Sequence, residues 1–498
     1  MAFSVGIDLG TSSVKLTLID DQGAVVGTAG CDYAPVCPQP GWKEIDPELW
    51  WNCTCTAMCD LLAPINAADV VAVGVTGQMH TTVFVDGKGQ SVRPALMWND
   101  TRDPELAACV RSAYEEAGLG YLSRIVSTGS PAVNLAWLAE NEPESFARME
   151  RFLVGPDWIV FKLTGSAGTD LCEASTSSLF DLESCDWDAR ARAVLGLPAE
   201  IYPEVVAAGA VVGGVSAAAA KASGLPEGCL VVHGTGDNPA AAIPTGCLTR
   251  KVPVLSLGTS GVLMGTRPEP DLEARGKNIL LSLDGTENMT LVQGVVQSCG
   301  SSYSWWIKDV LNLTSFDSAD AGIDVSRLGE GDLIFYPHLT GEKTLYGDPT
   351  LRGAFLGLST DVTQAQMTLA VMEGVAFGVR QLAEEMSFDL ASAGGLQVIG
   401  GGSKSRVWMQ VLADVLGVDT LQMRGQTGAG YGMALLALAV TAGGDGEETS
   451  LASRLDVLAG GAVSCAERFS PDAAAQARYE AKYERYLRIH DALKEVYG

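Results

Sequence analysis

Apolar and polar positions alternate at the start of the chain in the pattern of two short β-strands joined by a tight turn. In Val5–Asp20 (VGIDLGTSSVKLTLID), apolar residues alternate on both sides of a Gly-Thr-Ser turn. The same Leu-Gly-Thr-Ser string recurs in Val254–Thr266 (VLSLGTSGVLMGT), again between apolar runs. Four residues can recur by chance in a chain with 57 glycines. The shared flanking pattern instead favours a duplicated hairpin that opens each half of the protein.

Strand and helix patterns follow each hairpin. A helix is expected from near Pro47, and residues 70–86 indicate two strands around a loop. In the second half, residues 288–310 and 396–417 each indicate a strand, a glycine turn and a helix. Residues 363–386 have the apolar spacing of a long amphipathic helix. The pattern therefore predicts two α/β units.

Length and charge narrow the class of protein. A chain of 498 residues is too long for one hydrophobic core, so we expect two domains, residues 1–246 and 247–498. The net charge of −27 argues against nucleic-acid binding and disfavours an anionic membrane. No apolar run is long enough to span a bilayer, and the first residues enter a strand rather than a signal peptide. Twelve cysteines without paired spacing indicate reduced thiols and a cytoplasmic protein.

The two copies of the turn differ in the residue that precedes them. Glycine turns bind phosphate because bare backbone N–H groups can approach its oxygens, and the hydroxyls of Thr11 and Ser12 add donors. A carboxylate beside phosphates implies a divalent cation, so Asp8 predicts Mg²⁺ held through water. Ser256 stands in its place in the second copy, which favours a turn that binds phosphate without a metal.

Two further glycine turns lie between strands and helices of the second half, Ser298–Ser302 (SCGSS) and Gly400–Lys404 (GGGSK). Either turn alone is a common structural feature. Their shared position after predicted strands makes a nucleotide-binding role more persuasive for the two together.

The candidate for acid–base chemistry is Asp237, in a loop (GTGDN) that follows an apolar strand at the junction of the halves. Phosphoryl transfer to a hydroxyl needs a carboxylate that accepts the proton. The structural alternative is that Asp237 caps the next helix. His80 (GQMH) and Trp98 (WNDTR) also follow strands, where ligands bind in α/β domains, although each could equally be a structural residue.

The ordered set of motifs resembles the FGGY family of carbohydrate kinases from about Val5 to Ala439. It comprises GIDLGTSSVK, GQMH, WNDTR, GTGDN, SLGTSGV, TGEKTLYGDPTLRGAFLGL, AVMEGVAFGVR and GGGSKS. The resemblance implies an α/β, two-domain duplicated hexokinase/actin-like (ribonuclease H-like) ATPase fold with a central interdomain cleft. It also implies ATP-dependent phosphorylation of a sugar's terminal hydroxyl, with the sugar on the first domain and the nucleotide on the second.

Roles carried over by position follow from this resemblance. Asp237 resembles the catalytic base, and Asp8 resembles the carboxylate near Mg²⁺ and the transferred phosphoryl group. The residues expected at the sugar are Met79, His80, Asn238 and Trp98. Those expected at ATP are Thr11, Ser12, Thr259, Gly300, Gly401, Gly402 and Arg406.

The Met79-His80 pair bears on the sugar. Glycerol kinases of the family carry an Arg-Glu pair there, so this chain leans away from glycerol, and D-xylulose is the expected acceptor. Three departures keep another ketose, a polyol or gluconate open: Thr81 in place of glycine, Asn134 in place of lysine, and Leu345-Tyr346 in place of Pro-His.

The same superfamily suggests an alternative interpretation of this chain as a non-catalytic protein: an actin-like or chaperone-like ATPase, or a sugar sensor. A sensor that has lost its chemistry should lack Asp237, so its presence favours an enzyme. The C-terminal stretch 471–496 is expected to form a helix with tyrosines near one face. We expect this helix to dock onto its own domain, with a homodimer interface as the alternative.

Overall fold

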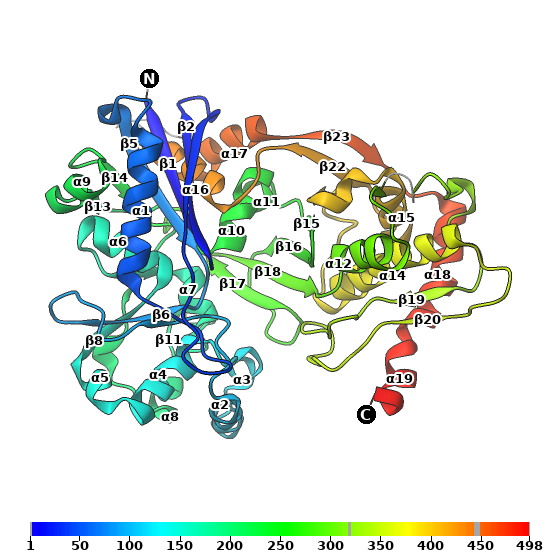
Figure 1. The fold of residues 1–498 in the computed structure, drawn as a ribbon, viewed down its shortest axis with the longest axis horizontal. Helices are drawn as coiled ribbons and strands as arrows, with labels where there is room; N and C mark the ends of the chain where they lie inside the picture. The colour runs from blue at the N-terminus through cyan, green and yellow to red at the C-terminus, as the bar shows by residue number, and fades with distance from the viewer. Residues whose placement is uncertain (1, 317–319, 443–448, 498) are drawn as a thin grey trace.

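The computed structural model describes residues 2–316, 320–442 and 449–497, and Figure 1 shows two sheet-containing halves side by side. The first half is built on a six-stranded sheet in the order β13-β14-β5-β1-β2-β3. Its strands are β1 (Phe3–Leu9), β2 (Ser13–Asp20), β3 (Val25–Asp32), β5 (Val70–Gly77), β14 (Leu230–Val232) and β13 (Val211–Gly214). Strands β1, β2 and β3 are antiparallel, whereas β5 and β14 run parallel to β1.

The second half contains a seven-stranded sheet in the order β17-β18-β16-β15-β21-β22-β23. Its strands are β15 (Val254–Leu257), β16 (Gly261–Arg267), β17 (Lys277–Leu281), β18 (Met289–Val296), β21 (Leu396–Ile399), β22 (Thr420–Gly425) and β23 (Val463–Phe469). Here β15, β16 and β18 are antiparallel, and β21 and β22 run parallel to β15. The strand order and directions repeat those of the first sheet, with β17 as an added edge strand. The predicted duplication of hairpin and α/β unit is therefore confirmed.

Helices cover the two sheets and connect their strands. In the first half these are α1 (Pro47–Leu62), α6 (Gly155–Thr164), α7 (Leu171–Thr176), α9 (Ala217–Ser223) and α10 (Asp237–Ala242). In the second half they are α11 (Cys247–Arg250), α12 (Gly300–Trp305), α14 (Gln364–Glu385), α15 (Arg406–Leu416), α16 (Ala429–Thr441) and α17 (Leu451–Ala462). The expected helices at Pro47 and 363–386 are α1 and α14, and their N-termini are capped by Asp46 and by a Thr363–Gln366 capping box.

In the chain, most of an additional layer of the first half comes between β5 and β14, and one of its short strands precedes β5. It contains the four-stranded sheet β4-β7-β6-β8, with β4 (Glu44–Ile45), β7 (Ala95–Leu96), β6 (Thr82–Asp86) and β8 (Met149–Val154). Around it lie α2 (Pro104–Glu116), α3 (Gly120–Ile125), α4 (Pro131–Asn141), α5 (Pro143–Arg148) and α8 (Ala189–Val194). Short strand pairs complete the fold: β9 (Gly168–Asp170) with β12 (Glu204–Val206), β10 (Phe180–Asp181) with β11 (Asp186–Trp187), and β19 (Ile334–Tyr336) with β20 (Ala354–Leu356).

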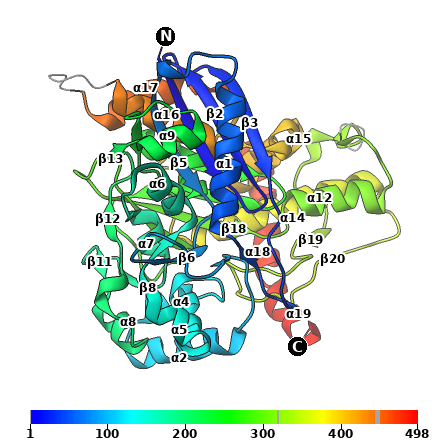
Figure 2. The same ribbon diagram turned by 60° about the vertical axis from the view of Figure 1, so that its left-hand side comes forward.

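The two faces of the first sheet are covered by helices from different halves. Figures 1 and 2 show α1 beside β2 and β3, and α16, from the second half, beside β1 and β5. The contact with α16 is so close that a Cβ on Gly6 would lie 1.7 Å from the carbonyl oxygen of Gly430. Only glycine permits this backbone approach. The domain boundary at 246/247 stays a prediction, and α16 crosses to the first sheet.

Alternation along β1 decides what faces α16. Val5, Ile7 and Leu9 are fully buried in the core that also contains Trp50 of α1. Because successive strand residues point to opposite faces, Asp8 points to the α16 side, where its Cβ would lie 3.4 Å from a Cβ on Gly430. The sequence pattern therefore places Asp8 at the N-terminal end of α16.

The C-terminal region forms two helices, α18 (Ala473–Leu487) and α19 (Ile489–Tyr497), where one continuous helix was expected. Tyr479, Tyr483 and Tyr486 of α18 are buried in the second-half core. The hydroxyl of Tyr479 donates a hydrogen bond to Glu373 of α14 over 3.0 Å, and Lys482 pairs with the same carboxylate. Docking of this segment onto its own half is therefore confirmed for α18.

All twelve cysteines are free thiols. Cys53, Cys55 and Cys59 lie along α1, and the described residues contain no group of three or more His, Cys, Asp or Glu side chains placed to hold a metal. In the described ranges, no helix combines the length and apolarity that crossing a bilayer requires.

Candidate active site

Three loops of the first half meet at the ends of neighbouring strands. The loop after β5 is held to β1 by a hydrogen bond from the Gln78 N–H to the Leu9 carbonyl (2.8 Å). A bridge between Gly77 and Gly236 joins the loops after β5 and β14. A Cβ on Gly236 would lie 2.6 Å from the side chain of Met79. The parallel order of β1, β5 and β14 thus brings the GTS, GQMH and GTGDN motifs together.

The first Gly-Thr-Ser turn is tied to its neighbours through backbone and side-chain groups. The Gly10 carbonyl accepts hydrogen bonds from the Tyr33 hydroxyl (2.5 Å) and the Gln78 amide (3.2 Å). The indole N–H of Trp98 donates to the Thr11 hydroxyl (3.1 Å). Trp98 keeps 42% of its surface exposed, so it is not the buried structural tryptophan that was the alternative. Its ring is available to a ligand.

Thr81 joins the GQMH and WNDTR motifs. Its hydroxyl donates to the Gln78 side chain and accepts from the Trp98 backbone N–H, each over 3.1 Å. Asn134 is fully buried and donates to the Thr82 hydroxyl over 2.9 Å. Two of the departures from the expected motif therefore have structural partners within the first half.

Asp237 begins helix α10, and the capping residue is Gly236. Its carboxylate accepts a hydrogen bond from the N–H of the next residue, Asn238 (2.8 Å). Burial, and secondarily the nearby charge of Asp8, raises the pKa of Asp237 to about 6. A pKa close to physiological pH suits a general base, and this role of Asp237 stays a prediction.

Asp8 lies close enough to Asp237 for their charges to interact. Burial raises the pKa of Asp8 to about 6, although the ammonium group of Lys15 acts in the opposite direction. Two half-buried carboxylates that repel each other form a site where positive charge is stabilised. The arrangement can therefore hold a cation and accept a proton within one small volume.

His80 has a backbone conformation that is rare outside glycine, with φ of 72°. Its N–H donates to the carboxyl group of Glu173 (3.1 Å), and its ring Nε2 lies 3.1 Å from the Lys277 ammonium. Burial, followed by the charge of Lys277, holds the pKa of His80 well below its usual value. The imidazole is therefore neutral at physiological pH.

Sequence reasoning missed Tyr33, Glu173 and Lys277. Tyr33 lies just beyond β3, and Glu173 lies on the short helix α7. Lys277 begins β17 of the second half, nearly two hundred positions beyond His80 in the chain. No local pattern marks any of these residues, because each reaches the site only through tertiary packing.

The glycine turns of the second half form another cluster. The Gly300 N–H donates to the Gly258 carbonyl (2.8 Å), and the Ser301 N–H donates to the Thr259 carbonyl (3.0 Å). A Cβ on Gly400 would lie 2.9 Å from the Leu257 carbonyl oxygen. The turns after β15, β18 and β21 therefore lie against one another, as their common position after strands predicted.

Within this cluster Thr259 and Gly401 are exposed, and Gly402 is half-buried against Leu257. Arg406 begins α15, with its guanidinium paired to Glu467 of β23 and 70% exposed. The role of Arg406 at the nucleotide stays a prediction, because its guanidinium is paired with Glu467.

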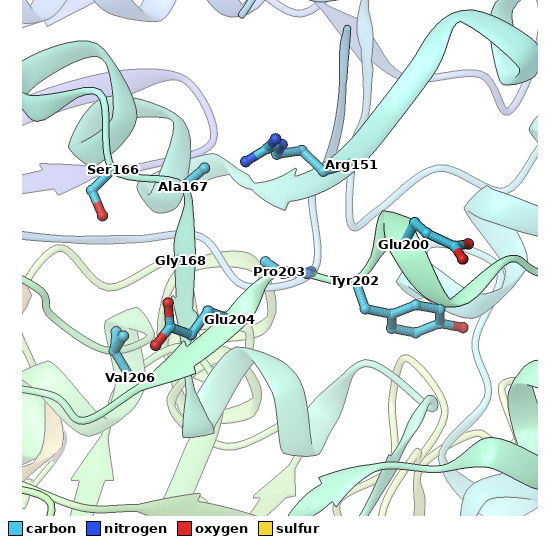
Figure 3. A pocket seen from close by; sticks show the side chains of 9 residues that line it. All are labelled: Arg151, Ser166, Ala167, Gly168, Glu200, Tyr202, Pro203, Glu204 and Val206. Atoms are coloured by element: carbon cyan, nitrogen blue, oxygen red, sulfur yellow. The ribbon is translucent and has the colours of Figure 1, made fainter. Parts of the chain in front are cut away.

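Figure 3 shows a separate hollow of about 300 Å³ in the first half. Arg151 of β8 and Glu204 of β12 contribute opposite charges to its wall. The remaining lining residues are Ser166, Ala167, Gly168, Glu200, Tyr202, Pro203 and Val206. None of the candidate catalytic, sugar or nucleotide residues lines this hollow, so it is distinct from the site described above.

Comparison with known proteins identifies matches along almost the whole chain. Residues 3–244 match the N-terminal domain of the FGGY family of carbohydrate kinases, and residues 254–440 match its C-terminal domain. A xylulose kinase from Escherichia coli is 30% identical over 98% of this chain and 99% of its own length. A glycerol kinase from Gloeobacter violaceus is also 30% identical, over 83% of each chain. The crystal structure of xylulose kinase from Rhodospirillum rubrum superposes with a TM-score of 0.87, at 26% identity and 99% coverage of both chains.

Proposed function

Because the chain belongs to the FGGY family of carbohydrate kinases, we propose that it transfers the γ-phosphoryl group of ATP to the terminal hydroxyl of D-xylulose. The products are D-xylulose 5-phosphate and ADP. Membership of the family makes the protein an ATP-dependent sugar kinase, and the two-domain α/β architecture agrees with it. The choice of D-xylulose is supported by relatives and structural neighbours named as xylulose kinases.

The observation that carries the catalytic proposal is the juxtaposition of Asp237 and Asp8 in the loop cluster of the first half. Asp237 accepts the proton of the sugar hydroxyl as that oxygen forms a bond to the γ-phosphorus. The bond from the γ-phosphorus to the bridging oxygen then breaks, and ADP leaves. A base whose pKa lies near 6 is ionised at neutral pH and still accepts a proton readily.

The other candidate residues have different roles in the two halves of the protein. Asn238 adjoins Asp237, and Met79, His80 and Trp98 lie on loops that meet the loop of Asp237, so we assign these four residues to the sugar. Thr11 and Ser12 supply hydroxyls to the transferred phosphoryl group from the first hairpin. The turns of the second half bind the rest of ATP through their backbone N–H groups. The residues assigned there are Thr259, Gly300, Gly401, Gly402 and, more distantly, Arg406.

Mg²⁺ fits the donor set of this site. Burial raises the pKa of both Asp8 and Asp237, the charge of Asp8 raises that of Asp237 further, and a divalent cation favours the ionised form of both. Mg²⁺ commonly binds one or two carboxylates together with substrate phosphates and water. Asp8 would hold it through water, and the ion would neutralise charge on the phosphates when bound.

Gluconate is the second candidate acceptor. The ammonium group of Lys277 lies at His80, in the part of the site assigned to the sugar. A positive charge there suits a sugar acid better than a neutral ketose. This observation is independent of the named relatives.

A coupled assay of ADP release tests both acceptors. We expect D-xylulose to give sugar-dependent turnover well above that with gluconate, glycerol, D-ribulose and simple polyols. Turnover with gluconate and none with D-xylulose would reject the acceptor and retain the kinase. Absence of sugar-dependent ADP release with the whole panel would instead favour a non-catalytic ATPase or sensor.

We also propose a cytoplasmic location. The twelve free thiols, six of them buried, suit a reducing compartment. Fractionation of the native host with a thiol-labelling reagent tests this placement.

A further inference from the structure

The contact between His80 and Lys277 joins residues of opposite halves. His80 follows β5 of the first half, and Lys277 begins β17 of the second half. The Lys277 nitrogen lies 3.1 Å from Nε2 of His80. The other ring nitrogen, Nδ1, is buried and has no hydrogen-bond partner in the described residues. One edge of the ring is therefore occupied, and the other is free.

The charges around this contact favour a protonated Lys277. The carboxyl groups of Glu173 on α7 and Asp237 on α10 act on Lys277, as does the thiol of Cys172. Lys343, from the loop before β20, carries a like charge that acts against it. Burial lowers the pKa of Lys277 below its ordinary value, and the two carboxyl groups act in the opposite direction, towards the ammonium form.

A protonated lysine decides which nitrogen of His80 carries the proton. An ammonium group has three donors and no acceptor, so Nε2 must accept the hydrogen bond. In a neutral imidazole the remaining proton then resides on Nδ1. The buried and unpaired Nδ1–H is a donor that a bound oxygen atom would satisfy.

The backbone at His80 supports a functional reading of this geometry. A φ of 72° is unfavourable for a residue with a Cβ. The conformation is held by the hydrogen bond from the His80 N–H to Glu173. Such a conformation fixes the ring at the edge of the loop cluster that contains Asp237.

We propose that Lys277 is a positioning residue that fixes His80 as an Nδ1–H donor to an oxygen of the acceptor sugar. The inference rests on the proposed function, because it needs a sugar bound beside Asp237. Lys277 acts through His80 rather than on the transferred phosphoryl group. Acceptor recognition thereby depends on a residue of the half that binds the nucleotide.

The tautomer itself can be measured without turnover. Histidine-selective ¹⁵N labelling gives four side chains in this protein, and a His80→Gln variant assigns the signal of His80. Long-range ¹H–¹⁵N spectra at about pH 8 should show His80 in the Nδ1–H form. A proton on Nε2, or on both nitrogens, would overturn the proposal regardless of which sugar is phosphorylated.

The second readout separates positioning from a general structural role. Lys277→Met keeps the length of the side chain and removes its donor, and Lys343→Met removes a nearby exposed charge as the matched control. We expect Lys277→Met to raise the sugar KM about tenfold, the scale of one lost hydrogen bond. The KM for ATP should stay near the wild-type value, and the control should change neither.

Removal of Lys277 should also make the sugar KM depend on pH. Burial, and secondarily the charge of Lys277, lowers the pKa of His80. In Lys277→Met the pKa of His80 should therefore rise, which brings its protonation closer to neutral pH. The carboxyl group of Glu173 lies beside His80, where it accepts a hydrogen bond from the His80 N–H. The variant's His80 should lose the pure Nδ1–H form in the spectrum.

Equal sugar KM values for Lys277→Met and Lys343→Met, or a proportional loss of sugar and ATP binding, would overturn the positioning role. Failure of the proposed function gives a different result. D-xylulose would then give no turnover with the wild type, but His80 would still carry its proton on Nδ1. The KM comparison would in that case use the acceptor found in the panel.

Discussion

Replacement of Asp237 by Asn should lower activity and raise stability in the same molecule. Asn keeps the size of the side chain and an oxygen that can accept from the Asn238 N–H. It removes the charge that burial and Asp8 make unfavourable. A positioned general base contributes about 10²–10⁴-fold to a rate, so kcat should fall by that order.

The stability gain follows from the pKa. The carboxyl group has a pKa of about 6 in the folded protein against 3.8 for an unperturbed aspartate. The folded state therefore binds more protons than the unfolded state between these values, and stability falls as the pH rises through this window. The difference corresponds to about 3 kcal/mol above about pH 7, at about 1.4 kcal/mol for each pH unit. Asp237→Asn should be more stable by up to this amount at about pH 8, with the advantage lost as the pH falls towards 4.

The assay compares kcat, by coupled ADP release, with thermal unfolding of the ligand-free protein at about pH 8 and about pH 5. Asp414→Asn is the matched control, because burial also raises the pKa of Asp414, which lies on α15 and accepts from the Asp472 N–H. The control should keep its kcat. A folded Asp237→Asn variant with kcat within tenfold of wild type would remove Asp237 from the catalytic role. A fall in melting temperature at pH 8 would refute the electrostatic reasoning.

Three further outcomes are expected. Because burial raises the pKa of both Asp237 and Asp8 to about 6, kcat/KM should fall as the pH decreases below about 6; a flat profile between about pH 5 and 7 would contradict this. Gly300→Ala places a Cβ 2.3 Å from the Gly258 carbonyl oxygen, so the KM for ATP should rise about 10- to 100-fold with little change for the sugar. Gly460→Ala, with no atom within 4 Å, is its control. Sugar plus a non-hydrolysable ATP analogue should reduce the radius of gyration in small-angle scattering, and an unchanged radius at saturation would count against closure of the halves.

Local patterns predicted the features that depend on neighbouring residues in the chain. The alternation in β1 and β2 and the Gly-Thr-Ser turn depend on a period of two and on one glycine, so the duplicated hairpin could be predicted. The grouping of Gly258 with Gly300 followed from strand ends in an α/β fold. The roles of Asp237 could not be separated by position alone; the structure assigns the cap position to Gly236, and the catalytic role of Asp237 stays a prediction.

Tertiary contacts account for what the sequence pattern left out. The segment 429–441 is apolar on all sides, which predicts a buried helix, but nothing in it says that it lies on the sheet of the other half. Its glycines carried a usable signal: Gly430 and Gly432 suggest a close approach of two backbones. Glu173 and Lys277 had no such signal, since a single charged residue in an unremarkable stretch is ordinarily solvated.

The position of Lys277 connects acceptor recognition to the packing of the halves. Strand β17 is held against the first half by the hydrogen bond from the Leu280 N–H to the Ser175 hydroxyl (3.0 Å) and by contacts between Tyr121 and Asn278. A displacement of β17 by one or two ångströms would break the 3.1 Å contact with His80. His80 would then be free to take the other tautomer, in which Nδ1 accepts and no longer donates. If Lys277 positions His80, the His80 hydrogen bond to the sugar therefore forms only when the two halves are arranged so that β17 lies against α7.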